Sequence, residues 1–148
     1  MDADALIRET ERYFHKLIPL TRAMGISVES RTAEQLVLSA PLDLNHNHLG
    51  TAFGGSLSAI ATLAGYGLLW LELDDREAHV VVRESSIKYL HPVKGAIRAI
   101  CQRPSEKEIE AFGARYRKAG KSRVNLRVTI EDEGRVCVEF KGSFVAIK

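Results

Sequence analysis

The chain has 148 residues, 45% of them hydrophobic and 27% charged, which is the composition of a soluble globule long enough to bury a core without disulfides. Its 21 basic and 19 acidic side chains leave a formal net charge of +2, which gives no electrostatic footprint for nucleic acid across the whole domain, so we expect no DNA or RNA binding. The two cysteines, Cys101 and Cys137, form neither a zinc motif nor a thioredoxin-type pair.

The N-terminal part of the chain predicts a helix followed by two strands. It lacks the basic and apolar regions of a secretory signal, so we expect a cytoplasmic protein with reduced thiols. Apolar residues recur at helical spacing among charges over residues 2–17, and Pro19 follows, which indicates an amphipathic surface helix. Two alternating runs, at 26–29 and 35–40, then predict a pair of strands that ends before Pro41.

A long apolar segment over residues 54–71 predicts a buried helix. It contains no charged residue, and its apolar residues fall on every side of a helical wheel, so protein or lipid must surround it. At ~1.5 Å per residue it reaches roughly 27 Å, nearly enough to cross a bilayer. Small and polar residues inside it, an acidic exit and the lack of Lys or Arg at either flank argue against a membrane span. We therefore expect the central helix of a soluble domain.

Two further strands and a short helix follow the apolar segment. Runs rich in β-branched residues at 79–90 and 95–101 predict the strands, each ending near a proline. Ser105 followed by Glu108 is a capping-box pattern, and helical spacing continues from there until Gly120.

The C-terminal part of the chain predicts a β-hairpin. Strict alternation precedes and follows a turn at 132–134, and Gly142 marks an expected bulge in the final strand. The order of the elements predicts a single α+β domain over residues 1–148. In this domain an antiparallel sheet of about six strands curls around the apolar helix.

The start of the apolar helix is the most promising place for chemistry. The pair Gly54-Gly55 uncovers amide hydrogens where the first helical turn has unpaired donors and the positive end of its dipole. Such donors suit a carbonyl oxygen that gains negative charge. Two glycines can also serve only the close packing of helix and loop, and this alternative stays open at this point.

Two other clusters suggest function less specifically. His46 and His48 form a His-x-His pattern without a third ligand, so we expect no metal ion and no other cofactor. Five positive charges within nine residues could meet a negatively charged partner, or could form a solvated helix face. These charges are Arg115, Arg117, Lys118, Lys121 and Arg123.

The loop before the apolar helix carries a family resemblance. Residues 47–55 resemble the loop of hot-dog fold proteins, which contains Asn, Gly, Thr and then His-Gly-Gly, and residues 87–93 resemble their strand ending in Tyr-x-x-Pro. In that fold a sheet wraps a central helix, and acyl thioesters bind at the helix N-terminus. More narrowly, residues 50–56 and 63–68 resemble the YiiD C-terminal group, labelled putative thioesterase and associated with malonyl-acyl-carrier-protein decarboxylation. The resemblance covers nearly the whole chain and implies a homodimer or a dimer of dimers.

The chain departs from the common hydrolase pattern at two positions. Phe53 stands where many relatives have His, and Thr62 stands where many have a catalytic Asp or Glu. No acidic residue lies between Leu44 and Leu71, so hydrolysis would need a base from elsewhere, for which Glu84 is the nearest candidate by analogy. Decarboxylation of a malonyl thioester requires only oxyanion donors and a proton source.

The resemblance therefore implies three functions in order of preference. The first is decarboxylation of malonyl-acyl carrier protein at the start of fatty acid synthesis. The second is hydrolysis of an acyl-coenzyme A or acyl-carrier-protein thioester. The third is a non-catalytic module that binds acyl groups.

The same resemblance assigns roles to the loop and its surroundings. We expect Asn45, Asn47, Gly54 and Gly55 to be catalytic, because a neutral amide donates to an enolate without first ionising. On spacing alone, both asparagines would be turn residues. His46, His48 and Tyr66 are the candidate proton donors, and Thr51 and Ser56 could donate hydrogen bonds or cap the helix. The residues expected to contact substrate are Thr51, Phe53, Ser56, His48, Tyr66 and Glu84.

Overall fold

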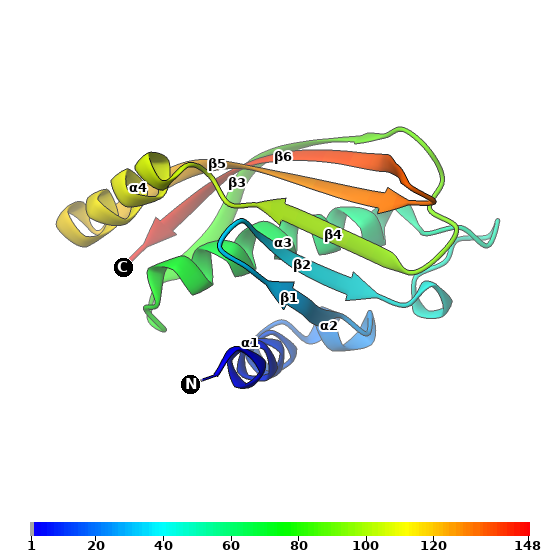
Figure 1. Ribbon diagram of the computed structural model, residues 1–148, viewed down its shortest axis with the longest axis horizontal. Helices are drawn as coiled ribbons and strands as arrows, with labels where there is room; N and C mark the ends of the chain where they lie inside the picture. The colour runs from blue at the N-terminus through cyan, green and yellow to red at the C-terminus, as the bar shows by residue number, and fades with distance from the viewer. Residues whose placement is uncertain (1) are drawn as a thin grey trace.

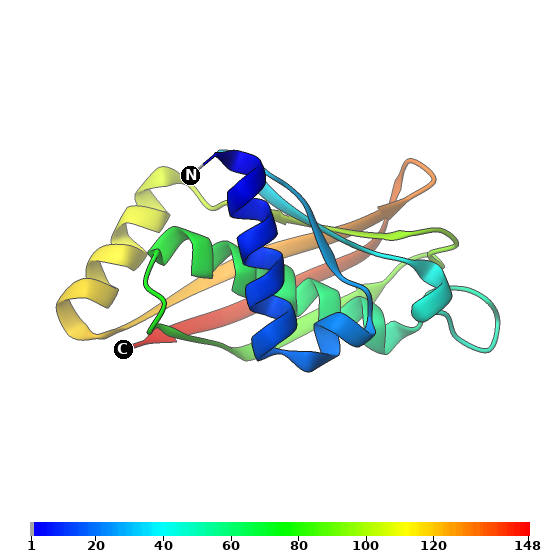
Figure 2. The same ribbon diagram turned by 90° about the horizontal axis from the view of Figure 1, so that it is seen from below.

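The computed structural model describes residues 2–148. A six-stranded antiparallel sheet of order β1-β2-β4-β5-β6-β3 curls around the long helix α3 (Figure 1). Helices α1 and α2 lie beside β1, and α4 lies at the end of the molecule opposite to the start of α3 (Figure 2). The helices are α1 (Ala3–Leu17), α2 (Pro19–Ala23), the 3-10 turn η1 (Leu42–Leu44), α3 (Gly54–Leu73) and α4 (Glu106–Ala119). The strands are β1 (Ser27–Arg31), β2 (Gln35–Ala40), β3 (His79–Tyr89), β4 (Ile97–Gln102), β5 (Lys121–Asp132) and β6 (Arg135–Ile147).

The helix boundaries follow the capping signals in the sequence. The Ser105 hydroxyl accepts a hydrogen bond from the Glu108 amide at the start of α4, and Gly120 ends that helix with a positive φ of 73°. These observations confirm the predicted short helix. The five-residue helix α2, which begins at Pro19, was not predicted.

The predicted C-terminal hairpin is present, but its bulge lies elsewhere. Gly142 sits in regular register opposite Ser85 and Leu126, so the bulge predicted at Gly142 is wrong. A Cβ atom at this glycine would lie 2.7 Å from the ring of Phe144, which explains why a glycine stands there. The irregularity in β3 falls between Val82 and Glu84 instead.

Helix α3 is buried on most of its surface but not all of it. Ten of its residues are buried, and its most apolar 18-residue window is 56% buried, although length and composition alone would allow it to cross a membrane. The less buried residues recur every three or four positions and form one stripe, which runs through Gly55, Ser58, Ala59, Thr62 and Tyr66. The large apolar residues of α3 are thus enclosed as expected, whereas this stripe of mostly small residues is only partly covered by the chain.

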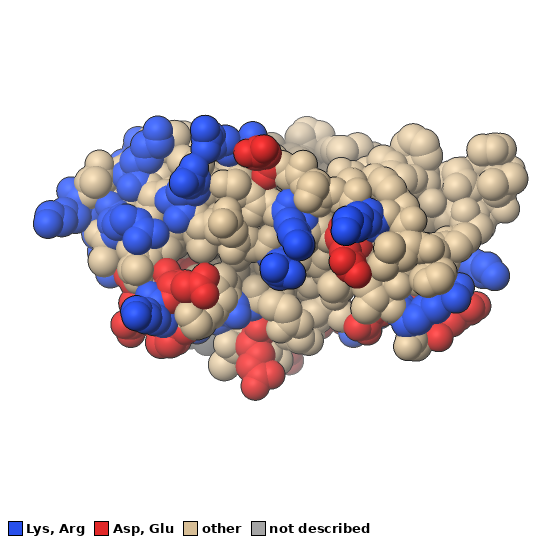
Figure 3. Space-filling view, turned by 90° about the horizontal axis from the view of Figure 1, so that it is seen from above, with Lys and Arg blue, Asp and Glu red and all other residues tan. Residues whose placement is uncertain are grey.

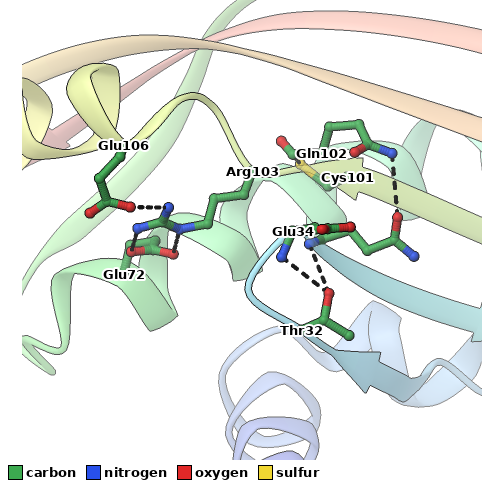
Figure 4. A network of polar contacts seen from close by, with 8 residues as sticks. Thr32, Glu34, Glu72, Cys101, Gln102, Arg103 and Glu106 are labelled. Atoms are coloured by element: carbon green, nitrogen blue, oxygen red, sulfur yellow. Dashed lines mark hydrogen bonds and ion pairs between the residues drawn. The ribbon is translucent and has the colours of Figure 1, made fainter.

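An ionic network holds the C-terminal end of α3. Arg103, which follows β4, lies between Glu72 of α3 and Glu106 of α4 (Figure 4). The Arg103 and Glu72 side chains are only 19% and 15% exposed. The guanidinium lowers the pKa of the Glu106 carboxyl below its usual value. This network joins three elements at one end of α3, and the other end meets a loop.

Candidate active site at the start of helix α3

The first turn of α3 presents unpaired amide hydrogens. Within residues 2–148, no oxygen accepts a hydrogen bond from the amides of Gly54, Gly55 or Ser56. The preceding residue, Phe53, offers no capping side chain, and only its carbonyl takes part by accepting from the Leu57 amide. Gly55 is exposed and Gly54 and Ser56 are half-buried, so this turn lies at the surface of the chain. Their position at the positive end of the helix dipole favours an oxygen that carries negative charge.

Asn47 shapes the loop that leads into α3. Its side-chain oxygen accepts from the amides of Leu49 and Thr51, at 2.8 and 3.2 Å, which is an Asx-type turn. Its side-chain nitrogen donates to the Thr51 hydroxyl at 2.9 Å and more weakly to the Ala52 carbonyl at 3.5 Å. Gly50 closes the turn with a positive φ of 78°, which few other residues adopt. The Asn47 amide therefore mainly holds the loop.

Asn45 anchors the same loop to the core. Only 3% of this residue is exposed, and its side-chain nitrogen donates to the carbonyls of Met24 and Pro41 at 2.9 and 2.8 Å. Its own carbonyl accepts from the Phe53 amide at 2.7 Å. Neither hydrogen of the Asn45 side chain is left to reach a substrate, so its role in this geometry is to position the loop.

Two aromatic rings flank the free amides. The Tyr89 hydroxyl donates to the Gly54 carbonyl at 3.2 Å, and its ring lies beside the Gly54 Cα. A Cβ atom at Gly55 would lie 2.5 Å from the Phe53 ring, so this ring packs against one side of Gly55. Tyr89 is 52% exposed and Phe53 is 56% exposed. The sequence prediction placed Phe53 here but missed Tyr89, although Tyr89 belongs to the Tyr-x-x-Pro pattern.

Three of the other residues predicted to contact substrate lie near the start of α3. Ser56 lies on the first turn of α3, and Thr51 and His48 lie in the loop before it. His46 contacts the Asn47 carbonyl at 2.9 Å through its ring. Among residues 2–148, no group of three or more His, Cys, Asp or Glu side chains converges as metal ligands would.

Tyr66 and Glu84 lie away from the free amides of the same chain. Tyr66 is twelve residues beyond Gly54, which is about 18 Å along the helix axis. Its partial burial raises the pKa of its hydroxyl, with a further contribution from Tyr13. Glu84 pairs with Ser143, whereas the neighbouring Gly142 faces the core, so Glu84 points away from α3. Its predicted role as a base at this helix end is therefore not supported within one chain.

An apolar groove of about 490 Å³ runs beside the partly exposed stripe of α3. Ala59 lies on its floor, one helical turn from Gly55, and Thr62 and Tyr66 follow. Val80 and Val82 of β3 line one wall. The Thr62 hydroxyl donates to the Ser58 carbonyl at 2.8 Å, so this position supplies neither a carboxylate nor a free donor. The groove suits a hydrocarbon chain better than a charged group.

Comparisons with known proteins agree with this architecture. Residues 7–148 match the family described as "Putative thioesterase (yiiD_Cterm)". A protein of unknown function from Chlorobaculum tepidum TLS is 33% identical, with a TM-score of 0.92 over 99% of this chain and 96% of that one. A putative thioesterase from Shewanella oneidensis is 30% identical, with a TM-score of 0.84 over 98% and 99% of the two chains.

A third structure supports the fold alone. The Pseudomonas aeruginosa protein PA5026, described as a probable thioesterase, has a TM-score of 0.81 at 23% identity over 95% of this chain and 94% of that one. The sheet wrapped around α3 is the hot-dog fold that these structures share. Because the family match spans nearly the whole sequence, the chain belongs to the YiiD C-terminal family of putative thioesterases.

Proposed function

We propose that this protein decarboxylates a malonyl thioester carried by acyl carrier protein, at the free amides of α3. In this reaction the bond between the carboxylate carbon and the methylene carbon breaks, and CO2 leaves. The electron pair moves into the thioester, which becomes an enolate with negative charge on its oxygen. A proton then adds to the methylene carbon and yields an acetyl thioester, which could begin fatty acid synthesis in the cytoplasm.

The observation that carries this proposal is a set of oxyanion donors in a segment that contains no carboxylate. The amides of Gly54, Gly55 and Ser56 are free, and the sequence has no Asp or Glu between Leu44 and Leu71. Fixed donors of this kind stabilise charge that develops in a transition state, at typical values of about 3 to 4 kcal/mol per donor. Decarboxylation needs such donors to stabilise the enolate but needs no activated water, whereas hydrolysis also needs a base to activate water.

Tyr89 is our candidate for the proton source. Its hydroxyl already lies within hydrogen-bond distance of the first turn of α3, and half of the residue is open to solvent. A small rotation of the Tyr89 side chain would break the hydrogen bond to the Gly54 carbonyl and let the hydroxyl contact a bound substrate. The loop histidines are the alternative donors, and His48 is exposed at the loop tip.

Hydrolysis of a longer acyl thioester is the second candidate, and the apolar groove favours it. A malonyl group would not use a groove of about 490 Å³ that starts one turn from Gly55. A medium-length acyl chain would lie along Ala59 and Thr62 with its carbonyl at the free amides. A base would then have to come from a second subunit.

We further propose that the working unit is a homodimer paired through β3. This strand ends the sheet, and nine of its eleven residues are exposed. The opposite edge strand, β1, is shielded differently, because the Val28 amide donates to Glu11 of α1 at 2.9 Å. A long unshielded edge strand is a ready site for pairing with a second chain. Pairing at this edge would also cover the open side of the α3 stripe.

Product analysis separates the candidate functions. The protein is incubated with malonyl, acetyl and octanoyl thioesters of carrier protein and of coenzyme A, and CO2 and free thiol are both recorded. Release of CO2 from the malonyl forms with the thioester retained supports decarboxylation. Free thiol from the octanoyl forms supports hydrolysis instead. If neither product appears with any of these thioesters, both catalytic proposals are rejected and binding alone remains.

A further inference from the structure

The basic cluster lies at the opposite end of the folded chain from the free amides of the same chain. We define it as Arg115, Arg117, Lys118, Lys121 and Arg123, all of them exposed. Figure 3 shows positive side chains gathered at the α4 end of the molecule. The Tyr116 hydroxyl donates to Asp75, just beyond the C-terminus of α3, at 2.7 Å. The 20 residues of α3, about 30 Å in length, therefore separate the cluster from Gly54.

The charges of this cluster have no acidic partners within residues 2–148. The arginines that form ion pairs within residues 2–148 are Arg76, Arg98 and Arg103 instead. Two cluster members, Arg117 and Lys118, lie in the last turn of α4, where positive charge stabilises a helix. That effect does not explain Lys121 and Arg123, which lie on β5. A concentration of unpaired positive charge on one end is the expected footprint of a negatively charged partner.

The strand register shows what pairing through β3 would do to this cluster. Across the sheet, Lys121 pairs with Ile147, and Ile147 pairs with His79, so the cluster lies level with the start of β3. The other end of β3 is Tyr89, which touches Gly54. A two-fold axis near the middle of β3 sets two copies antiparallel, so the start of one strand meets the end of the other. The basic cluster of one subunit then lies at the same end of the joined sheet as the free amides of its partner, although Lys121 and Arg123 project from the face of the sheet opposite to α3.

We propose that the basic cluster of one subunit docks an acidic acyl carrier protein whose thioester enters the site of the other subunit. The inference rests on the proposed function and on the β3 dimer. We assign the cluster to a protein surface because its charges spread over the end of α4 and the start of β5, which is broader than a single phosphate group requires. The shallow groove between these elements, of about 310 Å³, is lined by Arg115 and Arg123, with Glu108 also on its wall.

The first test compares two substrates that carry the same acyl group. In the variant Lys118→Glu with Lys121→Glu, the KM for malonyl-carrier protein should rise at least about tenfold, as expected for lost charge complementarity. Turnover of malonyl-pantetheine, which has no protein and no nucleotide, should stay unchanged. The matched control is Arg8→Glu with Arg12→Glu on α1, which makes the same charge change at two exposed positions. It should behave as the wild type with both substrates.

The second test places the two functions on different subunits. A chain with Gly54→Pro, which lacks one free amide, is mixed with a chain carrying the Lys118→Glu and Lys121→Glu changes. Docking across the dimer predicts that mixed dimers regain turnover of malonyl-carrier protein, to about half of the wild-type rate, because one site is complete. Each homodimer alone stays low. Mixed dimers that remain as inactive as both parents would show that a site uses its own cluster, which overturns the proposal.

A binding measurement keeps this inference separate from the catalytic proposal. Holo-carrier protein is titrated against wild type and the lysine variant by calorimetry, at low and physiological salt. Wild type should bind more tightly at low salt, and the variant should lose most of that affinity. If wild type turns over no thioester but shows this pattern, the proposed reaction fails and the docking surface stands. Equal binding by both proteins, or tight binding of coenzyme A at the cluster, would refute the docking surface.

Discussion

Phe53 is an unusual residue to precede a helix, because its ring offers no oxygen to the amide hydrogens of the first turn. Ser, Thr, Asp or Asn usually satisfies one of those donors, at a gain of about 1 kcal/mol. Here the amides of Gly54, Gly55 and Ser56 remain free, and the Phe53 ring packs against one side of Gly55 without accepting a hydrogen bond. Unpaired amides at its start destabilise the helix, but they leave donors from which the oxygen of a bound ligand can accept.

A capping side chain at position 53 should stabilise the protein and inhibit it together. In Phe53→Asp, the carboxylate should accept from the Gly55 or Ser56 amide and raise stability over Phe53→Ala by about 1 kcal/mol. Turnover should fall at least about tenfold below that of Phe53→Ala, because the internal acceptor competes with the enolate oxygen. Urea denaturation and CO2 release measure the two effects.

The variant Phe53→Glu is the charge control for this experiment. Its longer side chain carries the same charge but caps poorly, so its turnover should stay closer to that of Phe53→Ala. A stabilised Asp variant that keeps the activity of the Ala variant would indicate that the amides do not contact substrate.

Removal of a single amide hydrogen should affect catalysis more than folding. Gly54 is the first residue of α3, where proline is favoured, and Phe53 already has the extended ψ of 133° that a following proline requires. A Cβ at position 54 would meet only the Tyr89 ring, at an ordinary 3.6 Å. In Gly54→Pro, kcat should fall by about 10² or more, within the range seen for lost oxyanion donors, while the melting temperature changes little. Unchanged kcat would leave Gly55 and Ser56 as the donors.

At the scale of elements, the periodic segments could be predicted and the irregular ones could not. All six strands and helices α1 and α4 followed from hydrophobic periodicity and capping residues, and α3 followed from a long apolar segment without charges. Helix α2 has five residues, too few for a helical period to appear. The partly exposed stripe of α3 consists mainly of Gly, Ser, Ala and Thr, which are compatible with either a core or a surface.

Only those parts of the candidate site that are contiguous in sequence could be predicted. The loop and the glycine pair are contiguous in sequence, so their pattern could indicate an amide site. Tyr89 reaches Gly54 across 35 positions, and its contact depends on how β3 packs. Glu84 has the same strand parity as the inward Val82, and only the bulge between them turns Glu84 outward. A bulge of this kind leaves no clear mark in the sequence.

The close packing of α3 on the sheet predicts opposite effects of the same substitution at two helical glycines. In Gly65→Ala, the new methyl would lie 2.4 Å from the Phe144 ring, so overpacking should destabilise the protein by about 1 to 3 kcal/mol. In Gly113→Ala on α4, the nearest atom is the mobile end of Arg117 at 3.0 Å, and helix propensity should add up to about 1 kcal/mol. Urea denaturation of the two variants tests this. Equal stability would contradict the described packing of α3.

For the whole molecule, our proposal that β3 pairs with a second chain means that one chain holds only part of a site. Gly55 is exposed at the start of α3, and the stripe of α3 and its groove lie along the same side as β3. Pairing of two sheets would cover this side and bring together elements that lie at opposite ends of one chain. The fold itself does not depend on this pairing in our account, but catalysis does.

A charge placed at the centre of the β3 edge should separate the subunits. Ser85 is exposed, lies next to the middle of β3 and shares the inner face with Gly142. Ser85→Lys would bring two positive charges together at the proposed two-fold axis, and inward-pointing lysines are a natural block to edge pairing. Light scattering should show a dimer for wild type and a monomer with little turnover for the variant. A wild-type monomer with full activity would refute the shared site.

The most direct test of the whole account is a crystal structure with a malonyl thioester analogue that cannot react. We predict that the oxygen of its thioester carbonyl lies within about 3 Å of the amide nitrogen of Gly54 or Gly55, in the range expected for an oxyanion donor. The Tyr89 hydroxyl should then face the methylene carbon of the analogue. An analogue bound elsewhere, with the first turn of α3 still open to solvent, would contradict the account.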